Sequence, residues 1–281
     1  MQAVYNRLPI TYMYNGELCE YFQTRELSLS DLERMQDIKM KRSNPVTWVA
    51  KACCMIIENI GGVNVYEQYV NTKTIPDIIK KMPMGATTSV LIAGHIETLD
   101  SQIVDYPMRC PNSFCGEVNN VDLDLLSLDI PMAESSYEKS VVEVELGKGF
   151  KLLSDISKHY NLDPNIPFTK LSIRQPILGD VMALENLFTR DMSEVSPFWL
   201  KLYGKCIIKM ETADGDMLPD DVLDRQRGII VGSLGPKDIL IIKRALNKAF
   251  PKLEISAIKV CEKCGEEIKY DIDASFLFSM T

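Results

Sequence analysis

The sequence predicts an α+β fold, and three observations support this fold class. Helical and strand-like segments follow one another in mixed order, without the regular alternation of a parallel α/β fold. The composition is that of an ordinary globular protein, with 46% hydrophobic and 25% charged residues. Two cysteine pairs each lie in a turn between two strand-like runs. We therefore expect a helix-rich N-terminal half and a mixed second half.

A hairpin and a helix are expected at the start of the chain. Asn15-Gly16 is a strong two-residue hairpin turn, so residues 9–27 should form two strands. Ser30-Asp31-Leu32-Glu33 fits a capping box, in which the first and fourth side chains satisfy helix-end backbone groups. This motif places a helix at about 31–42.

More helices should complete the N-terminal region. Asn44-Pro45 provides an N-cap and a first-turn proline for a second helix, which we expect to end at Gly61-Gly62. Helical spacing of apolar residues predicts two further helices, at 75–81 and 87–102.

The second half should mix strands and helices. Two strands are expected within 104–123, and the turn Gly147-Lys148-Gly149 should follow a strand at 141–145. The remaining expected strands are 168–173, 255–260 and 267–273, and the expected helices are 178–190, a segment from 196 to 207, one capped at 219–221, and 237–250.

These elements suggest three units. Residues 1–103 would form a hairpin and helical domain. Residues 104–123 and 254–281 would together form one split unit around the cysteine pairs, and residues 124–253 an inserted domain.

Charge and hydropathy restrict the partners. The formal net charge is −8 and the isoelectric point about 5.0, so nucleic acid is not an expected partner, because phosphate contacts dominate its binding. No apolar run approaches the roughly 20 residues of a membrane span. The first residues lack a secretory signal pattern, so we expect a reducing compartment, where paired cysteines bind metal or stay free.

Eight cysteines divide into two groups. Those inside expected helices or strands should be small buried hydrophobic residues: Cys19, Cys53, Cys54 and Cys206. The other four form Cys110-x4-Cys115-Gly and Cys261-x2-Cys264-Gly. A tight turn places two sulfurs on one side, and the following glycine allows positive φ, so that backbone N–H groups can face the sulfurs.

Two such turns facing each other would complete a four-thiolate site for one Zn²⁺. We predict Cys110, Cys115, Cys261 and Cys264 as metal ligands, and a split zinc ribbon that holds a structural ion, because four thiolates leave no open position. Residues 116–260 separate the pairs, whereas ordinary ribbons have about 15–20 residues there. Metal-free thiols, a disulfide and a redox-active pair remain alternatives.

No catalytic site emerges from the other motifs. Only two histidines exist, and we expect His95 to be a satisfied histidine on an apolar helix and His159 to lie in a polar turn. The sequence has no Gly-x-Ser-x-Gly elbow, no His-Glu-x-x-His helix and no phosphate-binding glycine loop. We therefore predict no catalytic residues. Near the C-terminus, Phe276 and Phe278 should either pack back onto the chain or dock into another one.

Several segments resemble baseplate-hub and tail-assembly proteins of T-even-type contractile-tailed bacteriophages. They are Arg25–Asp31, Val121–Leu123, Glu145–Phe150, Leu171–Asp180 and the terminal Cys-x2-Cys-Gly. The Cys-x4-Cys spacing of the first pair departs from the usual pattern of these proteins.

The resemblance implies a non-enzymatic structural or assembly protein that binds other tail or baseplate subunits. It also implies a location in the host cytoplasm during assembly or in the virion tail. The alternative from another class is a zinc-ribbon transcription regulator that contacts nucleic acid or RNA polymerase. A third hypothesis is an enzyme with an unrecognised site, which a loss of turnover on mutating His95 or His159 would support.

Overall fold

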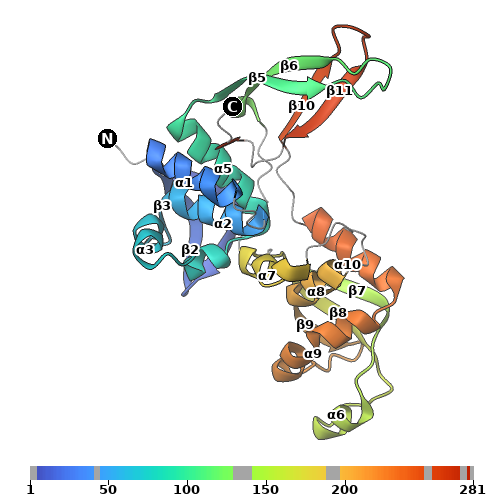
Figure 1. Ribbon diagram of the computed structural model, residues 1–281. Coiled ribbons are helices and arrows are strands. Elements are labelled where there is room, and N and C mark those ends of the chain that lie inside the picture. Colours follow the sequence, from blue (N-terminus) through green and yellow to red (C-terminus); the bar gives the residue numbers. More distant parts are fainter. Residues whose placement is uncertain are drawn as a thin grey trace.

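The computed structural model describes residues 5–40, 45–128, 141–187, 197–249, 255–272 and 277–278. These residues form helices and antiparallel sheets in two lobes, each with its own hydrophobic core (Figure 1). The predicted mixture of helices and strands is confirmed. None of the described helices is long and apolar enough to cross a membrane.

The first lobe contains a four-stranded antiparallel sheet in the order β1-β2-β3-β4. β1 (Tyr5–Tyr14) and β2 (Glu17–Thr24) form the predicted hairpin. Asn15 and Gly16 have φ values of 49° and 85°, the positive values that a two-residue turn between twisted strands requires.

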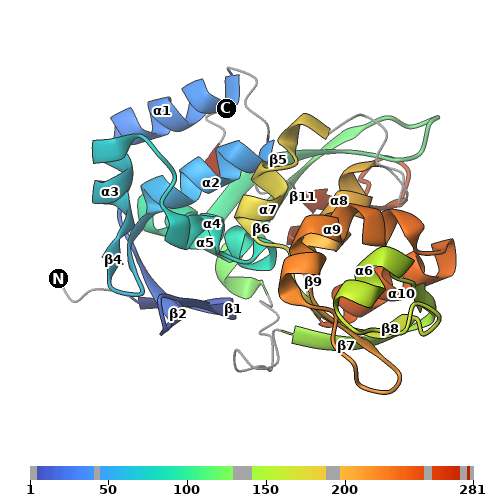
Figure 2. The same ribbon diagram turned by 90° about the horizontal axis from the view of Figure 1, so that it is seen from below.

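Five helices pack over this sheet (Figure 2). They are α1 (Leu29–Met40), α2 (Pro45–Ile56), α3 (Val65–Thr72), α4 (Asp77–Lys80) and α5 (Met84–Thr98). The cap of α1 is Ser28, two residues before the predicted Ser30. The Ser28 hydroxyl accepts from the Asp31 backbone N–H at 3.3 Å, and the Asp31 carboxylate accepts from the Ser28 N–H at 3.1 Å. The buried Asp31 also forms an ion pair with Arg25, and this pair favours a helix that starts after Ser28 rather than after Ser30.

The prediction that the second helix runs to Gly61-Gly62 is wrong. After Ile56 the chain enters β3 (Ile57–Ile60), which pairs with β2. Gly61 and Gly62, both with positive φ, then form a hairpin turn into β4 (Val63–Asn64). Pairing with a strand more than thirty residues earlier overrides the local helical pattern here.

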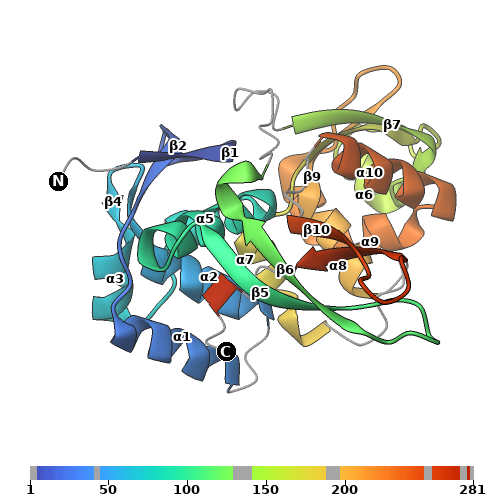
Figure 3. The ribbon, with the colours of Figure 1, turned by 90° about the horizontal axis from the view of Figure 1, so that it is seen from above.

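Two hairpins project from the first lobe and lie side by side (Figure 3). β5 (Gln102–Arg109) pairs with β6 (Val118–Asp124), and β10 (Ile255–Val260) pairs with β11 (Glu267–Ile272). All four strands fall where the sequence predicts them. The first core extends into both hairpins through a set of buried residues that includes Met108, Cys110, Cys261 and Ile268.

The second lobe is built on a three-stranded antiparallel sheet. Its strands are β7 (Val141–Phe150), β8 (Phe168–Arg174) and β9 (Ile207–Thr212), and its helices are α6 (Ser154–His159), α8 (Pro197–Cys206), α9 (Asp220–Ser233) and α10 (Pro236–Ala249). β9 lies in part where a helix through Ile207 was expected. Because β9 pairs with β8 in an antiparallel register, the chain leaves the helical conformation after Cys206, where α8 ends.

A short segment between β8 and α8 packs against the first lobe. α7 (Leu178–Met182), followed by a 3₁₀ turn at Glu185–Leu187, replaces the continuous helix expected at 178–190, of which 188–190 lie outside the described residues. The Leu178 N–H donates to the Met82 carbonyl at 2.9 Å, and the Met84 N–H donates to the Pro176 carbonyl at 3.0 Å. α7 thus belongs to the first core, although its residues lie in the expected insertion. The division into three units stays a prediction.

The glycine turn expected at 147–149 lies inside β7, as an irregularity in its pairing with β8. The buried Asp238 carboxylate on α10 accepts from the Gly147 N–H at 2.7 Å, the Lys148 N–H at 3.4 Å and the Gly149 N–H at 3.2 Å. A Cβ at Gly149 would lie 2.3 Å from the Phe168 carbonyl oxygen, so only glycine fits there. One carboxylate therefore anchors α10 to the sheet.

Replacing Asp238 should destabilise the second lobe. Asp238→Ala leaves three partly buried N–H groups without their acceptor, so the free energy of unfolding should fall by about 2–4 kcal/mol. Urea denaturation followed by circular dichroism measures this loss. Asp214→Ala, at an exposed position, is the matched control and should change stability by less than about 0.5 kcal/mol. Equal stability of the two variants would show that the carboxylate does not anchor the helix.

Candidate metal centre

The first cysteine pair lies in the loop between β5 and β6. Next to Arg109 and Val118, the last paired residues of the two strands, the Cys110 N–H donates to the Glu117 carbonyl at 2.8 Å. The Cys115 and Gly116 N–H groups both donate to the Asn112 carbonyl, at 3.0 and 3.1 Å. Gly116 has a φ of 61°, as expected for the glycine after the second cysteine. This backbone turns both thiols to the same side of the loop.

The second pair lies in the loop between β10 and β11, which is closed in the same way. The Cys261 N–H donates to the Glu266 carbonyl at 2.8 Å, and the Gly265 N–H donates to the Cys261 carbonyl at 2.9 Å. Gly265 has a φ of 75°. In both loops, the first cysteine bonds to the residue that follows the glycine, despite the different spacing of the two pairs.

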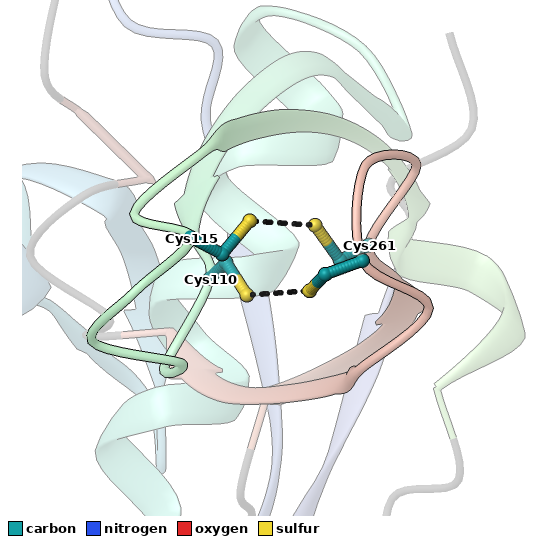
Figure 4. A group of neighbouring side chains, drawn as sticks. Cys110, Cys115 and Cys261 are labelled. Carbon is teal, nitrogen blue, oxygen red and sulfur yellow. Dashed lines mark hydrogen bonds between the residues drawn. The ribbon is translucent and has the colours of Figure 1, made fainter.

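The two loops bring all four sulfurs together (Figure 4). The four Sγ atoms lie within 4.8 Å of one another. The Cys110 and Cys264 sulfurs are 3.5 Å apart, and the Cys115 and Cys261 sulfurs 3.8 Å apart. Four thiolates at about 2.3 Å from a tetrahedral ion have sulfur–sulfur separations of about 3.8 Å, so the arrangement fits such an ion. Cys110, Cys115, Cys261 and Cys264 are the four residues predicted from the sequence.

Electrostatics in the cluster favour a bound cation. The backbone N–H groups of Cys264 and Lys263, together with the Asn119 side chain, lower the pKa of Cys261 to about 6. Burial and the neighbouring thiols raise the pKa of Cys110 to about 12. Four adjacent negative charges repel one another, so a divalent cation is what would let all four sulfurs ionise together.

Polar side chains connect the two hairpins beside the sulfurs. Lys259 donates to the Asn120 carbonyl at 2.6 Å, and Lys263 pairs with Glu117 at 3.1 Å. The buried Asn119 side chain reaches from β6 to the second cysteine loop. Asn119 is not predicted from the sequence, because an asparagine four residues after Cys115 carries no recognisable signal.

The remaining cysteines are buried in the two lobes, as predicted. Burial raises the pKa of Cys53 and of Cys206 to about 12 and also raises that of Cys54 and Cys19. Thiols of this kind stay protonated and pack as small hydrophobic side chains.

Neither of the two histidines belongs to the group of potential metal ligands around the sulfurs. His95 on α5 is buried, and its Nδ1 lies 2.5 Å from the Leu277 carbonyl oxygen, to which it donates. The Phe278 ring packs edge-on against it, with ring centroids 5.9 Å apart. This end of the chain thus packs back onto the protein, while Phe276 lies outside the described residues.

His159 ends α6 and lines a cavity of about 480 Å³ between α6 and α9. Tyr160 and Asp221, which also line it, are joined by a 2.6 Å hydrogen bond. Among the described residues, the four cysteines are the one group of three or more potential metal ligands that lies close enough together to share an ion.

Comparisons of the chain with protein-family models, with curated proteins and with solved structures found no match in any of the three.

The C-terminal contact of His95 should depend on pH. Burial lowers the pKa of His95 below its usual value of 6.5. As the pH falls through 6.5, the unfolded chain gains this proton before the folded chain does, so the contribution of His95 to stability is complete above that value and decreases below it. After correction for the slower intrinsic exchange at lower pH, the protection factors of the α5 amides should therefore fall more between pH 7.5 and 6.0 in the wild type than in His95→Phe. An identical pH response of both proteins would contradict the assignment.

Proposed function

We propose that Cys110, Cys115, Cys261 and Cys264 bind one structural Zn²⁺ as a split zinc ribbon. The convergence of four sulfurs from distant parts of the chain is the observation that carries this proposal. Soft thiolates in a tetrahedral set suit zinc, and when bound the ion would supply charge compensation and cross-linking.

The zinc would act as a clamp across the chain. It would join the loop after β5 to the loop after β10, which are 146 residues apart at Cys115 and Cys261. The whole second lobe lies between these points. Structural zinc contributes roughly 10–16 kcal/mol in small fingers, comparable with the roughly 5–15 kcal/mol that stabilises a whole domain. The ion would therefore dominate the stability of the hairpin pair.

We further propose that the chain is a non-enzymatic structural or assembly protein of a bacteriophage tail baseplate, where it binds other tail subunits. The likeness of its segments to T-even-type tail-assembly proteins supports this proposal. Three of those segments lie at packing junctions: Arg25–Asp31 caps α1, Glu145–Phe150 contacts Asp238, and Leu171–Asp180 packs on the first lobe. The acidic net charge weighs against the alternative of a regulator that contacts nucleic acid.

Purified protein should contain one zinc per chain, and Cys264→Ser should remove it. Serine cannot replace a thiolate ligand, so β10–β11 should lose hydrogen-exchange protection while the core of the second lobe keeps it. Zinc measured by mass spectrometry and exchange measured per peptide report the two effects. Glu266→Ser, an exposed substitution in the same loop, should keep both the metal and the protection. Well under one metal ion per wild-type chain would refute the zinc site.

The assembly role predicts specific partners. A tagged chain purified from phage-infected cells should carry tail or baseplate subunits, and Cys264→Ser should lose them if the clamp shapes the binding surface. Enrichment of RNA polymerase, or DNA binding that weakens steeply with salt, would instead support the regulator.

A further inference from the structure

Asn119 is a buried side chain that crosses between the two cysteine loops. It lies on β6 of the first hairpin and is 3% exposed. Its Nδ2 group donates to the Cys261 sulfur at 3.6 Å, and its Oδ1 accepts from the Glu262 backbone N–H at 3.0 Å. Both partners belong to the second hairpin, more than 140 residues away in the sequence. The same amide also lies 3.5 Å from the Glu117 carbonyl of its own hairpin.

We propose that Asn119 is a positioning residue of the metal centre, which sets the metal affinity by holding the second cysteine loop in register and by stabilising the charge of the Cys261 thiolate. This inference rests on the proposed metal site. Asn119 would be a fifth residue of the site, which contacts the metal-binding Cys261 rather than the ion itself.

The two hydrogen bonds require an amide. An amide side chain offers N–H donors and a carbonyl acceptor at the same time. Aspartate at position 119 would keep the acceptor for the Glu262 N–H but would turn a second carboxylate oxygen toward the Cys261 sulfur. Alanine would lose both bonds and leave the Glu262 N–H without its partner.

The bond to Cys261 matters because of the charge of the site. A divalent ion with four thiolates keeps a net charge of −2, and N–H donors to the sulfurs offset that charge. Asn119 adds a donor from the opposite hairpin, so the bond forms only when the two loops are correctly docked. Partners of this kind typically change metal affinity 10–100-fold when they are replaced.

The next residue provides a matched control. Asn120 is the same residue type on the same strand, but side chains alternate along a strand, and its side chain is exposed. Its Nδ2 group donates to the Asp105 carboxylate at 3.4 Å, at the surface rather than at a sulfur. Asn119→Asp and Asn120→Asp therefore make the same chemical change on opposite faces of β6.

The test uses the full chain and two metal ions, Co²⁺ for spectroscopy and Zn²⁺ for affinity. Asn119→Asp should bind Zn²⁺ 10–100-fold more weakly than wild type in competition with a chromophoric chelator. Its sulfur-to-cobalt charge-transfer band should move to lower energy, because a thiolate without its N–H donor gives up electron density more easily. Asn120→Asp should keep the wild-type affinity within about threefold and the wild-type band.

Each other outcome is decisive. Wild-type affinity and spectrum in Asn119→Asp would overturn the role of Asn119 and leave the metal site intact. Weaker binding with an unmoved band would overturn the electrostatic role, since Asn119 would then only support the fold. If Asn119→Asp does not fold, Asn119→Ala, which loses both bonds, takes its place with the same criteria. A wild-type chain that binds neither ion refutes the proposed metal site itself.

Discussion

The rest of the architecture depends on the contact between two short cysteine loops. Each loop ends a two-stranded hairpin, and an isolated hairpin is marginally stable in water. The hairpins β5–β6 and β10–β11 bury their inner faces against each other and against the first core, and the four sulfurs lie at their outer end. The long excursion that forms the second lobe leaves and returns between these hairpins. Their contact therefore determines where that lobe is attached.

A second junction fixes the lobe from the other side. Backbone hydrogen bonds join Pro176 to Met84, the first residue of α5, and Leu178 to Met82 just before it. A Cβ at Gly179 would lie 3.1 Å from the Lys80 carbonyl oxygen. Arg174 pairs with the buried Asp180 at 2.7 Å and holds the turn into α7. The segment that follows β8 is thus joined to the first lobe by a close backbone contact, which tolerates little change of side-chain size.

Sequence reasoning succeeded where the chemistry is local. Asn15-Gly16 needs no distant partner to favour positive φ, and a glycine after each cysteine pair indicates a tight turn by itself. Prediction failed where a segment distant in the sequence determines the local structure. β3 forms because β2 is beside it, and Ser28 rather than Ser30 caps α1 because Arg25 holds Asp31. Asn119 and Asp238 act on residues 89 to 143 positions away, so nothing in their neighbourhood in the sequence could indicate their roles.

The length of the excursion is not an obstacle to a single metal clamp. Loop-closure entropy grows with the logarithm of loop length, so closing a loop of about 145 residues instead of about 17 costs only about 2 kcal/mol more. That cost is small beside the stabilisation that a structural zinc ion would give. Contacts other than the metal also offset it, because the first core, the Lys263–Glu117 pair and the Asn119 bonds hold the hairpins together. A chain can therefore carry a whole lobe between the two halves of one four-sulfur site, provided that the hairpins recognise each other through more than the metal.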